Sequence, residues 1–72
     1  TVPHLVIQGE RGPVTILLLA EETIYASLPI EGEAVRGVIL PVGSGSIAVI
    51  GERDEPLDKI QEQVVNSVHW KT

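Results

Sequence analysis

The sequence predicts a small α+β domain: an antiparallel sheet of four to five strands, in meander order, with one C-terminal amphipathic helix packed on one face. Short β-branched and apolar segments alternate with breaks rich in glycine and proline up to residue 51, which is typical of antiparallel strands. Beyond residue 52 the apolar residues recur every three or four positions, as in a helix. With 72 residues, the chain has room for one domain, 1–72.

The first two predicted strands form a hairpin. Residues 4–8 are mostly apolar and end at Gly9–Pro13, a break that contains two glycines and a proline. The next segment, Val14–Leu19, is apolar on both alternation faces. We therefore expect it to be a central strand with the helix covering one of its faces.

Three further segments complete the predicted sheet. Residues Ile24–Ile30 predict an irregular edge strand, because Pro29 lacks the N–H that a central strand needs. Residues 34–42 and 46–51 predict a second hairpin, and the sequence Gly43-Ser44-Gly45 predicts a three-residue turn between them.

The predicted helix follows at once. Asp54 is the expected N-cap, and Glu55 and Pro56 suit a first turn. The expected buried stripe consists of Leu57, Ile60, Val64 and Val68, with Val65 widening it. Four polar residues are expected to face water: Lys59, Glu62, Gln63 and Asn66. Trp70 is placed to fold back onto the rim of the sheet.

Composition excludes several classes of partner and cofactor. The net charge is −5, and the basic residues are scattered along the chain: Arg11, Arg36, Arg53, Lys59 and Lys71. Nucleic acid and direct membrane binding are therefore not expected, because both need a basic face. The absence of cysteine excludes disulfides and thiolate zinc sites. No apolar run approaches the roughly 20 residues that span a bilayer.

The sequence also predicts that this domain is a fragment of a longer protein. The chain contains no methionine and opens on Thr1-Val2-Pro3 directly against an apolar stretch. A domain of this size, with no disulfide, typically relies on a metal or a partner surface for stability.

No catalytic, cofactor-binding or metal-binding residues are predicted. His4 and His69 lie at opposite ends of the chain without metal-ligand spacing, and the pairs Glu21/Glu22 and Glu31/Glu33 fall in expected loops. The alternative is a small metal-dependent or carboxylate-using hydrolase that brings these groups together.

Unpaired strand edges are the predicted functional feature. An exposed edge pairs readily with another chain, so we expect either a protein partner or self-association through such an edge. The candidate partner-contact residues are Tyr25, Pro29, Glu31 and Glu33. Two alternatives stay open: Pro29 and the acidic loops protect the edge, or the domain is a purely structural dimerisation module.

The glycine, proline and core positions also carry a family resemblance. They lie in residues 2–8, 12–19, 31–33, 36–41 and 45–51. The sequence there resembles the C-terminal domain of an uncharacterised bacterial family of single-span inner-membrane proteins with an anti-sigma-like, zinc-binding N-terminal segment. The resemblance implies a non-enzymatic sensor or interaction domain on the periplasmic side of a membrane-anchored regulator. The zinc-binding motif and the membrane helix of the family have no counterpart in this chain.

Overall fold

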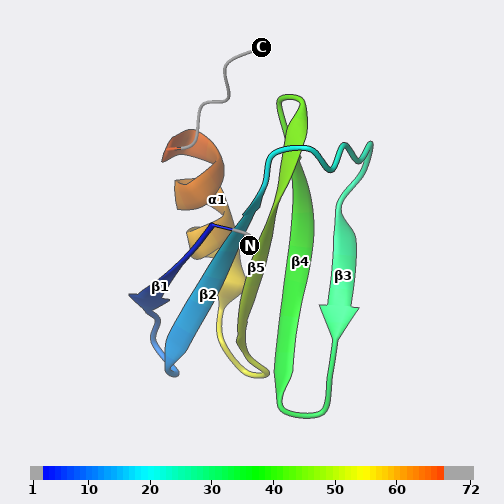
Figure 1. Cartoon of the computed structure of the whole chain (residues 1–72). Helices are drawn as coiled ribbons and strands as arrows, with labels where there is room; N and C mark the ends of the chain where they lie inside the picture. The colour runs from blue at the N-terminus through cyan, green and yellow to red at the C-terminus, as the bar shows by residue number, and fades with distance from the viewer. Residues whose placement is uncertain (1–2, 68–72) are drawn as a thin grey trace.

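The computed structural model describes residues 3–67, which form a five-stranded antiparallel sheet with one helix on one face (Figure 1). The strands are β1 (His4–Gln8), β2 (Pro13–Leu19), β3 (Leu28–Glu31), β4 (Val35–Val42) and β5 (Gly45–Glu52). The helix α1 spans Leu57–Ser67. The predicted fold class is therefore confirmed.

The strand order departs from a pure meander at one connection. The order across the sheet is β1-β2-β5-β4-β3, so β2 pairs with β5 rather than with β3. Residues 20–27 run past the hairpin end of β4 and β5 (Figure 1), where the Thr23 hydroxyl donates a hydrogen bond to the Ser44 carbonyl at 2.7 Å. This order places the apolar strands β2 and β5 in the centre, where most apolar surface is removed from water.

The core lies between the sheet and α1. Its fully buried side chains include Val14 on β2, and Ile47 and Val49 on β5. The predicted helix stripe is confirmed for Leu57, Ile60 and Val64, which are 2%, 9% and 8% exposed. Val65 is 42% exposed and does not widen the buried stripe. The four polar residues expected to face water are exposed, as predicted. Val68 and Trp70 lie outside the described residues.

Two sequence predictions about the second half of the sheet need correction. The third strand is shorter than predicted, because residues 24–27 belong to the crossing connection rather than to β3. The hairpin between β4 and β5 has a two-residue turn, since Val42 pairs with Gly45. Gly43 takes a φ of 59° at the first central position, which is the conformation that favours glycine in such turns.

The prediction that Asp54 caps the helix is wrong. Helix α1 begins three residues later, at Leu57. A turn closed by the Glu55 N–H donating to the Glu52 carbonyl, at 3.0 Å, separates Asp54 from the helix. The Asp54 carboxylate lies instead 3.8 Å from Nε of Arg11, and both side chains are largely exposed. Among residues 3–67, no helix is long and apolar enough to cross a bilayer.

Candidate functional site

The groups of the hydrolase alternative lie in separate parts of the fold. His4 is exposed at the start of β1. Glu21 and Glu22 are in the crossing connection, near the hairpin end of β4, whereas Glu31 and Glu33 lie at the opposite end of that strand. His69 falls outside the described residues. Within the described part of the chain, no three metal-ligating side chains form a group.

The four candidate partner-contact residues follow the β3 edge. Tyr25 lies in the crossing connection and is 94% exposed. Pro29 and Glu31 are exposed on β3 itself, and Glu33 is exposed in the turn that leads to β4. The fold therefore places Pro29, Glu31 and Glu33 along one border of the sheet, with Tyr25 before it.

The backbone of β3 is partly blocked at this border. The Gly32 N–H donates to the Val35 carbonyl at 2.9 Å, and hydrogen bonding to the neighbouring strand alternates along an antiparallel pair. Ile30 and Leu28 therefore bond to β4, while Pro29 and Glu31 direct their backbone outward. Because proline has no N–H, the outer edge of β3 lacks one of its two outward donors.

The opposite border, β1, has no such block. The Leu18 N–H donates to the Pro3 carbonyl at 3.0 Å, so by the same alternation Leu5 and Ile7 bond to β2. The backbone groups of His4, Val6 and Gln8 point away from the sheet. Leu5 and Val6 also have exposed side chains, at 46% and 57%. Within the described residues, β1 offers an unpaired edge with all its donors present.

One face of the sheet is apolar and is not packed against the helix. The strand register puts seventeen residues on the face opposite α1, and ten of them form its central part. We call this set the open face: His4, Val6, Thr15, Leu17, Leu28, Ile30, Gly37, Ile39, Ala48 and Ile50. These ten residues include no Asp, Glu, Lys or Arg, and among the described strands the one charged residue on this side of the sheet is Glu52, at the end of β5. Val6 and Leu28, on the two outermost strands, are 57% and 48% exposed.

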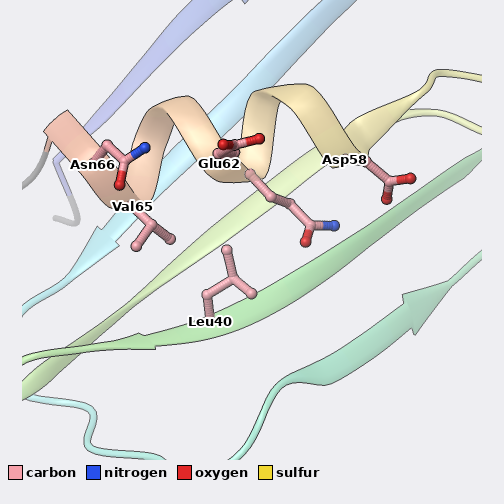
Figure 2. Close-up of a pocket in the computed structure, with 6 residues that line it drawn as sticks. Leu40, Asp58, Glu62, Val65 and Asn66 are labelled. Carbon is pink, nitrogen blue, oxygen red and sulfur yellow. The ribbon is translucent and has the colours of Figure 1, made fainter.

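A shallow groove runs between α1 and β4 on the other side of the sheet. Figure 2 shows Leu40 rising from β4 toward Val65 on α1, with Asp58, Glu62 and Asn66 along the helix side. The hollow has a volume of about 290 Å³. Its floor is apolar and its rim carries the carboxylates of Asp58 and Glu62, so the groove offers an amphipathic contact surface.

Glu55 has a structural role that the sequence did not reveal. Its side chain is only 1% exposed, and its two carboxylate oxygens accept the backbone N–H groups of Glu10 and Arg11 at 2.9 and 2.7 Å. A Cβ on Gly9 would lie 2.5 Å from Oε1 of Glu55. An acidic residue just before a helix normally signals an interaction with the helix end, so nothing local in the sequence pointed to this contact.

Residues 1–68 match the family model described as "Protein of unknown function (DUF3379)". Neither the curated proteins nor the solved structures yield a match. The family model covers nearly the whole of the 72-residue chain, and the protein therefore belongs to this family of unknown function.

Proposed function

We propose that this domain is a non-enzymatic sensor or protein-interaction domain on the periplasmic side of a membrane-anchored, anti-sigma-like regulator. The resemblance of the sequence to single-span inner-membrane proteins supports the location and the regulatory role. The separation of His4 from Glu31 and Glu33 supports the assignment of a binding role rather than a catalytic one. The partner is an extended segment of another protein, which pairs with a strand edge of the sheet.

The open edge of β1 is the observation that carries this proposal. Its outward N–H and C=O groups at His4, Val6 and Gln8 supply the main-chain hydrogen bonds that an added strand uses. The exposed side chains of Leu5 and Val6 supply apolar contacts on both sides of that strand. At the other border, Pro29 removes a donor and so weakens any pairing with β3.

A proline substitution distinguishes the two edges. Val6→Pro removes the central outward donor of β1 but leaves the β1–β2 hydrogen bonds, because the Val6 N–H is not part of that ladder. Glu31→Pro makes the matching change on β3. Val6→Ala is the control that shortens the side chain and keeps the N–H. Each variant is used as bait against a periplasmic extract, and its folding is checked by circular dichroism.

We expect Val6→Pro to lose the partner that the wild-type domain and Val6→Ala both capture, while Glu31→Pro retains it. Loss with Glu31→Pro alone would place the contact on β3, where the sequence predicts it, and would refute the β1 edge. Retention by both proline variants would refute strand addition altogether.

The cellular location has its own test. In spheroplasts that produce the full-length protein, added protease should degrade this domain while a cytoplasmic marker survives. A full-length protein that fractionates with the soluble cytosol would contradict the proposed location and regulatory role.

A further inference from the structure

We propose that the open face binds the open face of a second copy of this chain, so that two sheets stack with their helices outward. This inference is independent of the strand addition at β1, because it concerns side chains on a face rather than backbone at an edge. Antiparallel sheets that leave one face in water normally alternate apolar and polar residues. Here β2 and β5 are apolar on both faces, and α1 covers only one of them.

The placement of the charges favours a second copy over a charged partner. The acidic and basic residues of the described chain lie in the loops, on α1, on the helix side of β3 and β4, or at the strand end at Glu52. The open face itself carries none, and only Glu52 borders it, at the end of β5. A partner selected by charge would find that single carboxylate at one end of the face, whereas the uncharged apolar surface complements itself across a two-fold axis.

The area of the open face limits the affinity of the proposed dimer. Five strands spaced about 4.8 Å apart, over about five residues of about 3.4 Å each, present roughly 400 Å². Two copies would then bury roughly 800 Å², below the range of about 1,200–2,000 Å² that stable interfaces bury. The contact therefore gives a weak dimer in dilute solution. It becomes populated where two copies are held close together, because tethering raises the effective concentration to about millimolar.

Two exposed apolar residues, one on the open face and one on α1, allow a matched pair of test substitutions. Leu28, on the open face, is 48% exposed and Val65, on α1, is 42% exposed. Lysine at either site brings the net charge of −5 closer to zero, so general repulsion between copies falls equally in both variants. Only Leu28→Lys places a charge where the two sheets would meet.

Sedimentation equilibrium measures the association between copies of the chain. The chain concentration runs from about 10 μM to about 1 mM, the range in which a contact of this size is expected to form. We expect a reversible dimer for the wild type, a dissociation constant more than about tenfold higher for Leu28→Lys, and little change for Val65→Lys. A monomer throughout this range would overturn the proposal. So would equal weakening by both lysine variants.

The two modes of contact are separable. Leu5 lies on β1 with its side chain on the helix side of the sheet, so Leu5→Lys changes the β1 edge and leaves the open face intact, and self-association should persist in this variant even where partner capture is weakened. If Leu5→Lys abolishes the dimer and Leu28→Lys does not, the copies pair edge to edge and the face-to-face arrangement is wrong.

Discussion

Oε1 of Glu55 accepts the backbone N–H of Arg11 at 2.7 Å, across 44 positions of the chain. Oε2 accepts the N–H of Glu10, so one buried carboxylate satisfies both residues at the turn between β1 and β2. The segment that leads into α1 is thereby fastened to the first hairpin. Because a buried carboxylate without hydrogen-bond partners is costly, this contact fixes where the helix begins relative to the sheet.

Glu55→Gln should destabilise the domain. The amide keeps the shape of the side chain but replaces one acceptor by a donor that faces a backbone N–H. We expect a loss of about 2 kcal/mol in the free energy of unfolding, and a larger loss for Glu55→Ala, which leaves both donors unpaired. Urea denaturation measures both. The control is Asp54→Asn, which changes an exposed ion pair and should cost less than about 0.5 kcal/mol.

Gly9→Ala should be destabilising through the same carboxylate. The added Cβ would lie 2.5 Å from Oε1 of Glu55, so either the hairpin or the carboxylate must move. We expect a cost of about 1–3 kcal/mol in the free energy of unfolding, typical of overpacking. In a Glu55→Ala background the obstacle is gone, and the same glycine substitution should cost much less. Equal costs in both backgrounds would show that Gly9 is needed for another reason.

Tyr25→Ala should leave stability unchanged. The ring is 94% exposed, and surface substitutions of this kind change the free energy of unfolding by less than about 0.5 kcal/mol. Thermal unfolding checks this. Any loss of partner capture by the variant would then report a direct contact at Tyr25 and would support the residues that the sequence predicts. A lower melting temperature would instead reveal packing by this side chain.

Local patterns were enough to predict the elements themselves. A short β-branched and apolar run predicts β1, which spans residues 4–8 as expected. The three- and four-residue spacing of Leu57, Ile60 and Val64 predicts the buried side of α1. Pro29 predicts an edge strand because the missing N–H is a property of the residue itself. These predictions depend only on near neighbours in the chain, which is why they are readable from sequence.

The candidate site was less accessible to such reasoning. The sequence directs attention to the β3 border, through Tyr25, Pro29, Glu31 and Glu33. The fold adds a second border at β1 and the open face, and both depend on which strands are neighbours. The apolar character of β2 on both faces was the available signal for the open face, but periodicity does not say how many faces a single helix covers.

The sequence by itself determined the α+β class, the hairpins, the amphipathic helix and the acidic, cysteine-free surface, because each follows from the chemistry of residues close together in the chain. Only the tertiary structure decided that β2 pairs with β5, that Glu55 binds the turn at Glu10 and Arg11, and that one apolar face remains without a helix. These features join residues that are far apart in the chain. They are set by the total burial and hydrogen bonding of the whole domain rather than by any local preference.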